Sequence, residues 1–237
     1  MMPAIFLVVA ALYAAVGHGG ASGYLAVMAL AGFEPVAMKP TALVLNLLVS
    51  FIGTVAFVRA GHFSWRLFWP FAVVAVPFAY LGGGWSLSAA AFHWLVAGAL
   101  AFAAARLFLP APQRTELRPP PAWAVVIAGA AIGFVSGLIG VGGGIFLTPL
   151  ILFCRWSDTK TAAAVSAPFI LVNSAAGLLG QAGSLHNLPA SWPWLAVAAA
   201  AGGLLGSRWG SRLARPTQLR PALALVLLIA SVKLVLT

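Results

Sequence analysis

Long apolar segments separated by short polar interruptions run through the whole chain. Most are 18 residues or longer, enough for a helix to cross a hydrocarbon core of ~30 Å. The sequence lacks the alternating apolar and polar positions of outer-membrane barrel strands. The pattern therefore predicts an all-α polytopic membrane protein, with apolar segments at residues 3–16, 21–32, 36–58, 64–82, 86–108, 122–139, 143–154, 161–182, 190–210 and 219–236.

Composition leads to the same class. Apolar residues make up 62% of the chain and charged residues 7%, whereas a soluble domain carries about 25% charged residues. The net charge of +10 does not indicate nucleic-acid binding, because the basic residues lie singly or in small groups at the ends of apolar segments, where they set topology. The expected surroundings are a lipid bilayer.

The chain contains one unit written twice, and each copy opens on a glycine-rich break. The breaks are residues 17–23 and 137–144, and matching positions further on stay 121 to 124 residues apart. Examples are Lys39 with Lys160 and Trp85 with Trp209. We therefore divide the chain into transmembrane repeat 1 (1–108), a proline-rich linker (109–121) and transmembrane repeat 2 (122–237).

Two topologies fit the segments. In the first topology, 3–32 and 122–154 are each one broken helix that crosses the membrane. The 13 Lys and Arg residues then divide six against seven between the two sides. If 3–32 and 122–154 are re-entrant hairpins, only Lys39 and Lys233 lie on the side of the termini, and the other eleven lie opposite. The positive-inside rule expects such an asymmetry. We therefore predict a hairpin and three transmembrane helices in each repeat, an inverted second repeat and a cytoplasmic linker.

The glycine-rich breaks are the candidate substrate site. Half-helices that begin near Ala21 and Gly144 would present unpaired N–H groups and the positive end of the helix dipole to an anion, and an inverted repeat would aim both at one centre. Consecutive glycines exceed what helix packing needs, so we assign to the site Gly19, Gly20, Gly142, Gly143 and Gly144. Glycines spaced by four are assigned to helix packing instead, namely Gly129, Gly133 and Gly137 and also Gly202, Gly206 and Gly210.

Polar side chains within the apolar segments are further candidates. Asn46, Ser166 and Asn173 must find partners at that depth, and hydrogen bonding between helices is the alternative to substrate contact. Ser22 follows the first break. His18 lies inside that break, where Val141 stands in the second copy, and it suits a substrate hydrogen bond, a proton relay or a helix-end donor.

No cofactor, metal or catalytic group is expected. The chain's acids, Glu34, Glu116 and Asp158, fall in predicted loops, and no cluster of His, Cys and acidic residues is present to bind a metal. His18 and Ser22 lack the orienting carboxylate of a catalytic triad. Without acids inside the membrane, a carboxylate-based cation or proton relay has no members, which favours an anionic or neutral substrate.

The second break is similar to the repeated glycine motif of the sulfite exporter TauE/SafE family, and the likeness extends over nearly the whole chain. The matching residues are Gly137-Leu138-Ile139-Gly140-Val141-Gly142-Gly143-Gly144, followed by apolar residues, Pro149 and Leu150. The first break departs from the motif at Ala21 and Ser22, and Ala26 stands where Pro149 would. This resemblance implies a multi-pass transporter of the bacterial plasma (inner) membrane for small anions, mainly sulfur oxyanions or organosulfonates.

The expected function is therefore transport of a small anion by alternating access. An anion channel is the main alternative, and an intramembrane enzyme or a structural membrane subunit is a weaker one. The expected partners are the anion and the bilayer, and a homodimer is compatible with the sequence.

Overall fold

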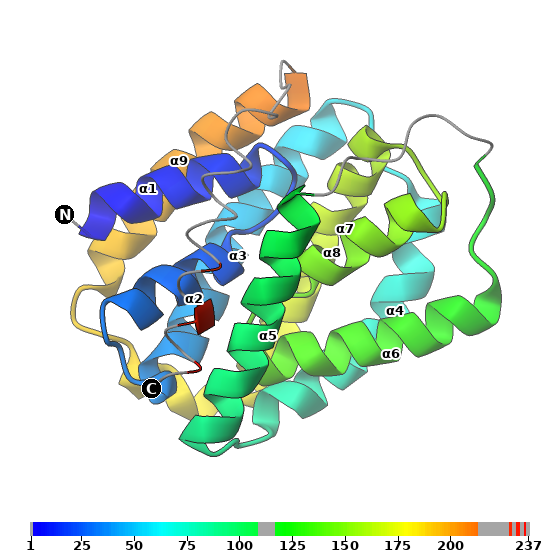
Figure 1. The fold of residues 1–237 in the computed structure, drawn as a ribbon. Coiled ribbons are helices and arrows are strands. Elements are labelled where there is room, and N and C mark those ends of the chain that lie inside the picture. Colours follow the sequence, from blue (N-terminus) through cyan, green and yellow to red (C-terminus); the bar gives the residue numbers. More distant parts are fainter. Residues whose placement is uncertain (1, 109–116, 213–227, 229–230, 233–234, 236–237) are drawn as a thin grey trace.

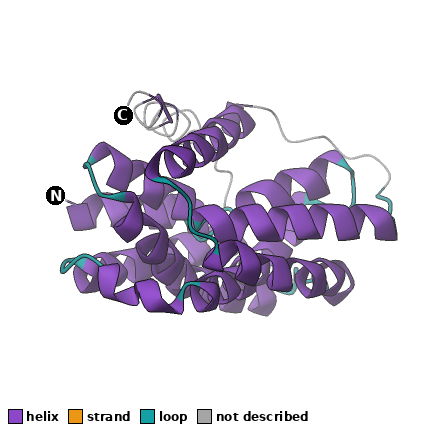
Figure 2. Ribbon diagram, turned by 90° about the horizontal axis from the view of Figure 1, so that it is seen from below, coloured by secondary structure: helices purple, strands orange, loops and turns teal. Residues whose placement is uncertain are grey.

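The computed structural model describes residues 2–108, 117–212, 228, 231–232 and 235. Within these residues every regular element is a helix (Figure 2). Predicted segment 219–236 and linker residues 109–116 lie almost entirely outside the described part. Figure 1 labels the main helices, which are α1 (Met2–Ala14), α2 (Ala21–Leu30), α3 (Pro35–Arg59), α4 (Trp65–Gly84), α5 (Ala89–Phe108), α6 (Ala122–Ile139), α7 (Gly144–Phe153), α8 (Thr159–Gly180) and α9 (Trp192–Arg212), with the 3₁₀ helix η1 (Ala182–Asn187) before α9.

Among the described residues, α3, α4, α6 and α8 are long and apolar enough to cross a membrane. The prediction of an all-α polytopic membrane protein is therefore confirmed. Helix α6 coincides with the predicted segment 122–139 and has 18 residues. At 1.5 Å per residue it extends roughly 27 Å, so this helix alone reaches most of the way through a bilayer.

Helices α3 and α8 form an antiparallel pair at the centre of the molecule. Asn46 of α3 hydrogen-bonds Ser174 of α8 at 3.3 Å. Towards the end of α3 the partners come from earlier in α8, since Gly53 faces Ala167. Close helix approach at these positions brings the middle of α3 beside the middle of α8.

The remaining long helices pack in two further pairs, in which glycines face carbonyl groups. Figure 1 shows α9 along α1 and α6 along α4. A Cβ atom on any glycine of the α9 series would collide with main-chain carbonyls of α1; these glycines are Gly202, Gly206 and Gly210, and the carbonyls are those of Leu7, Ala11 and Ala15. On α6, Gly133 and Gly137 face the carbonyls of Ala75 and Ala79 in the same way. The assignment of these glycines to helix packing is confirmed.

Each broken segment folds back on itself. In the first, α2 returns along α1, so that the ring of Tyr24 stacks on that of Phe6 with centroids 5.2 Å apart. In the second, the residues before α6 and after α7 lie together, because the N–H of Arg118 donates to the carbonyl oxygen of Arg155 at 2.9 Å. The residues that flank the second broken segment therefore lie side by side.

Candidate functional site

Both breaks are built from glycines with left-handed backbone angles. Gly20, the residue before α2, has φ 96°, and Gly143, the residue before α7, has φ 85°. Gly17, Gly140 and Gly142 also have positive φ. Side chains other than glycine rarely adopt these angles, so each glycine-rich motif sets the sharp turn from which its half-helix begins.

Asn46 joins the two breaks. Its Oδ1 accepts a hydrogen bond from the N–H of Ala21, the first residue of α2, at 3.1 Å. Its Nδ2 donates to the carbonyl of Val141, in the second break, at 3.1 Å, and to Ser174 Oγ at 3.3 Å. The side chain is fully buried. One amide near the middle of α3 therefore ties together α2, the second break and α8.

The glycines around Asn46 leave no space for a side chain. A Cβ at Gly142 would lie 2.7 Å from both Asn46 Nδ2 and Ser174 Oγ, and one at Gly19 would collide with Asn46 Oδ1. The side chain of Ile170 fills the other side of Gly19, Gly142 and Gly144. In this structure the consecutive glycines thus allow close packing, in addition to presenting their backbone.

His18 reaches from the first break towards the second. Its ring carbon Cδ2 would be 3.5 Å from a Cβ on Gly144, the first residue of α7. His18 Nδ1 lies 3.0 Å from the carbonyl oxygen of Val16, which orients the ring. The imidazole is only partly buried. His18 is the one ionisable side chain among the described residues of the two breaks.

Three predicted site residues make their hydrogen bonds elsewhere. Ser22 Oγ donates to Tyr13 OH at 3.1 Å, within the first hairpin. Ser166 Oγ shares a hydrogen bond of 2.6 Å with Thr148 of α7. Asn173 Nδ2 donates to the carbonyl of Phe169 at 3.0 Å, one turn back in α8, while its Oδ1 is buried without a hydrogen-bond partner. These residues surround the Asn46 contact but are not joined to it.

The two half-helix N-termini differ in how they are capped. Asn46 caps α2 at Ala21. The N-cap residue of α7 is Gly143, which has no side chain with which to cap the helix. The first N–H groups of a helix have no partner within it. Asn46 therefore caps the start of α2, and His18 lies beside the start of α7.

Lys39 occupies the far flank of the second break. Its Nζ donates to the carbonyl of Gly83 at 2.8 Å and approaches that of Gly82 at 3.5 Å, at the C-terminal end of α4. A cation there interacts favourably with unpaired carbonyls and the helix dipole. Its Cγ also packs against Gly140, 3.1 Å from where a Cβ would lie.

The predicted match between Lys39 and Lys160 is not structural. Ala163 lies against Gly17 of the first break as Lys39 lies against Gly140 of the second. Lys160 instead lies exposed in the first turn of α8. The helices explain the shift, because the N-cap residues Glu34 and Asp158 are 124 positions apart, whereas the two lysines are 121 apart.

The centre is polar but uncharged. The buried polar side chains of the described residues are Ser, Thr and Asn, and no group of three potential metal ligands occurs among them. Glu34 and Asp158 sit at helix starts outside the centre. Burial opposes the charge of Asp158, but hydrogen bonds from Thr161 and Lys160 outweigh it and lower the pKa of this carboxyl. Apart from Lys39 on the flank of the second break, the electrostatics of the centre therefore come from helix ends and amides.

Sequence reasoning did not single out Ile170, Tyr13 or Lys39 as part of these surroundings. An isoleucine in an apolar span carries no signal that it will cover three glycines. Ser174 is also a polar residue inside an apolar segment, and it matches Ser50 in the first repeat. We selected its neighbour Asn173 instead, because an amide in a membrane needs more hydrogen-bond partners than a hydroxyl. The hydrogen bond to Asn46 identifies Ser174 as the α8 residue at the junction.

Comparisons with known proteins identify the family of the chain. The family described as sulfite exporter TauE/SafE matches residues 2–234. A protein of Sinorhizobium fredii (strain NBRC 101917 / NGR234), named probable membrane transporter protein y4hK, is 44% identical over 234 residues, which cover 97% of this chain and 95% of that protein. No solved structure matches the chain. By extent and identity, the chain belongs to the sulfite exporter TauE/SafE family of membrane transporters.

Proposed function

We propose that the protein is a secondary transporter that moves a small anion across the bacterial inner membrane by alternating access. The substrate would be sulfite or another sulfur oxyanion or organosulfonate, held at the N-termini of α2 and α7. Membership of a transporter family supports the class. The residues we assign to binding are those of the two breaks with Asn46, while Ser166 and Asn173 support them from α8.

The observation that carries this proposal is the position of Asn46. It occupies the N–H of Ala21 and binds the second break at Val141. An anion at a helix start accepts hydrogen bonds from the first N–H groups, and here the amide oxygen of Asn46 is the acceptor in the place of the anion. We infer that Asn46 Oδ1 holds the donor in the empty carrier and yields it to an arriving oxyanion.

The packing supports an inverted repeat. A parallel repeat would orient α3 and α8 the same way, whereas these helices are antiparallel, with Asn46 on Ser174 and Gly53 near Ala167. The contact between Arg118 and Arg155 supports the hairpin form of 122–154, because a single crossing would separate the two residues by roughly a 30 Å core. Inverted repeats with broken helices are a recurring transporter architecture.

The uncharged centre supports an anion over a cation. A cation site in a membrane usually contains acidic side chains, and the described acids, Glu34 and Asp158, lie at helix starts away from the breaks. A doubly or singly charged oxyanion would instead find N–H groups at two positive helix ends, with the His18 ring alongside.

The test compares Asn46→Asp with wild type in liposomes. The carboxylate keeps an acceptor for Ala21, loses the donors to Val141 and Ser174, and adds negative charge where the anion binds. The carboxylate would retain the N–H of Ala21 and so deprive the anion of one hydrogen bond, at a cost of about 1.5–3 kcal/mol, or tenfold or more in affinity. We expect sulfite uptake to fall at least tenfold, measured with labelled sulfite against thiosulfate, sulfate, methanesulfonate and lactate.

The matched control is Ser88→Asp. Ser88 is exposed and its hydroxyl accepts from the N–H of Ala91, a role that Asp also performs well. Its transport should equal that of wild type. Saturable uptake stimulated by anion loaded inside the liposome supports a carrier, and unsaturable flux without such stimulation indicates the channel alternative. Native transport by well-folded Asn46→Asp would exclude Asn46 from the site.

A further inference from the structure

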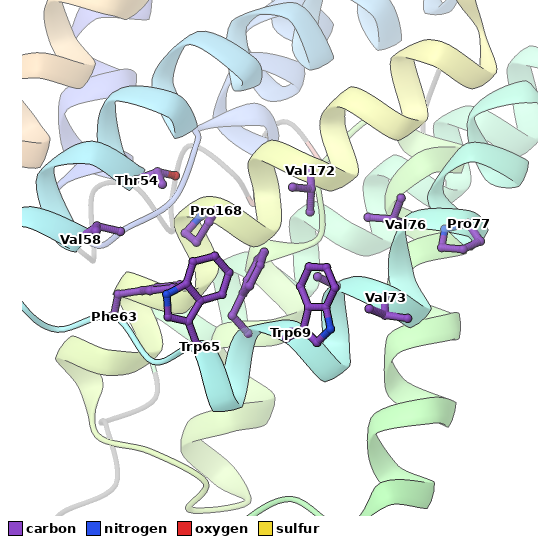
Figure 3. Close-up of a pocket in the computed structure, with 12 residues that line it drawn as sticks. Thr54, Val58, Phe63, Trp65, Trp69, Val73, Val76, Pro77, Pro168 and Val172 are labelled. Atoms are coloured by element: carbon purple, nitrogen blue, oxygen red, sulfur yellow. The ribbon is translucent and has the colours of Figure 1, made fainter.

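An apolar groove lies on the side of the bundle, apart from the breaks. It has a volume of ≈ 510 Å³ and is formed by α3, α4 and α8. Figure 3 shows Phe63, Trp65 and Trp69 on one side of the groove and Pro168 and Val172 of α8 on the other. We propose that this groove binds an acyl chain of an anionic phospholipid, whose phosphate is held by Arg59 and Arg66.

The chemistry of the walls matches hydrocarbon. Valine, phenylalanine, proline and alanine side chains supply most of the surface. The one hydroxyl, on Thr54, donates to the carbonyl of Ser50 at 2.7 Å and so has its donor occupied. Burying a hydrated anion against such walls would cost its solvation without replacing it. A lipid chain loses nothing there and gains contact.

The length of the groove matches one leaflet. Along α4 its lining extends from Trp65 to Pro77, which at 1.5 Å per residue is roughly 18 Å. Half of a ~30 Å hydrocarbon core is about 15 Å. The groove therefore begins near the membrane surface and ends near the midplane, as an acyl chain does.

The mouth of the groove carries the complementary charge. Val58 and Trp65 line the groove, and their chain neighbours are Arg59 and Arg66. Both arginines are exposed, and the structure shows no ion pair between them and a described carboxylate. Guanidinium groups bind phosphate with two parallel hydrogen bonds. Trp65 and Trp69 are 67% and 60% exposed, as is usual for tryptophan at the headgroup level.

The connections that follow α3 and α8 differ in length. The α8–α9 connection contains η1, which packs against α3. In the first repeat the corresponding α3–α4 connection is only residues 60–64 and contains no helix. Of that connection, Phe63 lines the groove.

Lipid retention on the purified protein tests the proposal without any transport measurement. Native mass spectrometry would count phosphatidylglycerol and phosphatidylcholine bound from an equal mixture. We expect wild type to retain phosphatidylglycerol selectively. In the double variant Arg59→Gln with Arg66→Gln the selectivity should fall about fivefold per arginine, since each basic residue near an anionic surface contributes about 1 kcal/mol. Arg208→Gln, which removes an exposed arginine on α9, should leave it unchanged.

A second pair of variants tests the groove itself. Val73→Trp would place an indole in the groove, and Val126→Trp adds the same ring on α6; the two valines are 52% and 54% exposed. Val73→Trp should lose the bound lipid and Val126→Trp should keep it. Equal selectivity in the arginine double variant and Arg208→Gln overturns the proposal. Lipid retention by Val73→Trp also overturns it. If Val73→Trp dissociates a dimer while the lipid stays bound, the groove is a contact between two copies of the chain instead.

Discussion

At the scale of single residues, the centre depends on one amide with three partners. Asn46 accepts from Ala21 and donates to Val141 and Ser174. Removing one partner of a buried hydrogen bond leaves the others unsatisfied, at about 1–3 kcal/mol each. Asn173 is the contrasting case, with an unpartnered Oδ1. The two asparagines resembled each other in sequence, but only one links the repeats.

The glycines of the breaks combine conformation, packing and proposed binding, so bulky substitutions there do not separate these roles. A Cβ at Gly143 would lie 2.9 Å from Ile132 Cγ2 and 3.0 Å from Phe169 Cε1, at φ +85°. Gly143→Val would therefore disturb folding as well as any anion contact. Gly20 has the same problem, because the ring of Tyr24 lies 2.8 Å from its Cβ position. Substitution of Asn46 therefore tests anion binding more directly than substitution of these glycines.

Asp158 predicts a pH-dependent contribution to stability. It accepts from the N–H groups of Lys160 and Thr161 at 2.9 and 3.1 Å at the start of α8. We expect Asp158→Ala to lower the free energy of unfolding by about 1 kcal/mol at neutral pH, and Asp158→Asn to change it little, because asparagine is also a good N-cap.

The sign of the pH effect follows from the lowered pKa of Asp158. Stability from the charged carboxylate is fully present above the unfolded-state pKa of about 3.9 and is lost as the pH falls through the lower folded-state value. The difference in Tm between wild type and Asp158→Ala, followed in detergent from pH 7 to pH 3, should stay constant at first and shrink below about pH 4. A difference that grows on acidification would contradict this assignment.

At the scale of helices, close approach of backbones organises the bundle. Apolar side chains gain little by associating within lipid, so small residues that allow contact between main chains become important. Gly133 on α6 and Gly206 on α9 are examples, each facing a carbonyl of the neighbouring helix. Only glycine fits at these two positions, because a methyl group would collide with the neighbouring carbonyl.

These contacts predict the effect of adding one methyl group. Gly133→Ala and Gly206→Ala should each lower Tm, with an overpacking cost of about 1–3 kcal/mol. Gly98→Ala on α5 is the matched control, because no heavy atom lies within 4 Å of its Cβ position. There alanine should raise stability by about 0.5–1 kcal/mol through better helix propensity. Thermal unfolding of the three variants in detergent would decide, and equal effects at all three positions would contradict the packing assignment.

The positions of the helices along the chain could be predicted from the sequence, whereas the face that each helix turns towards the centre could not. The segments predicted at 36–58 and 64–82 agree with α3 and α4 to within two residues at each end, because apolar runs and glycine breaks mark helix ends directly. Which face of a helix meets the centre depends on packing between repeats. For that reason the hydrogen bonds from Ser22 to Tyr13 and between Ser166 and Thr148 could not be predicted from the sequence.

At the scale of the whole molecule, the duplicated sequence produces matching helix pairs with different contents. The second break carries the full glycine motif and an α7 start without a side-chain cap. The first carries His18 and an α2 start capped by Asn46. The lysine on the flank of the second break has an alanine counterpart beside the first. These differences give the two halves unequal electrostatics around the Asn46 contact.

The last prediction concerns the membrane topology, and a cysteine of the chain can be used to test it. Cys154 is the single cysteine and is exposed in the turn after α7. With hairpins, Cys154 lies on the same side of the membrane as the linker; with broken spanning helices, it lies on the opposite side. The measurement is labelling by a membrane-impermeant maleimide in intact cells and in inverted vesicles. Two single-cysteine variants in a Cys154→Ser background, Gln113→Cys and Ser86→Cys, mark the linker side and the opposite side.

We expect Cys154 and Gln113→Cys to react only in inverted vesicles, and Ser86→Cys only in intact cells. Ser86 lies opposite the linker in both topologies, so it controls for membrane integrity without favouring either. The hydrogen bond between Arg118 and Arg155 and the eleven-to-two division of basic residues both require Cys154 on the linker side. If Cys154 reacts together with Ser86→Cys, segment 122–154 crosses the membrane, the repeats are parallel, and two half-helices can no longer point at a shared centre.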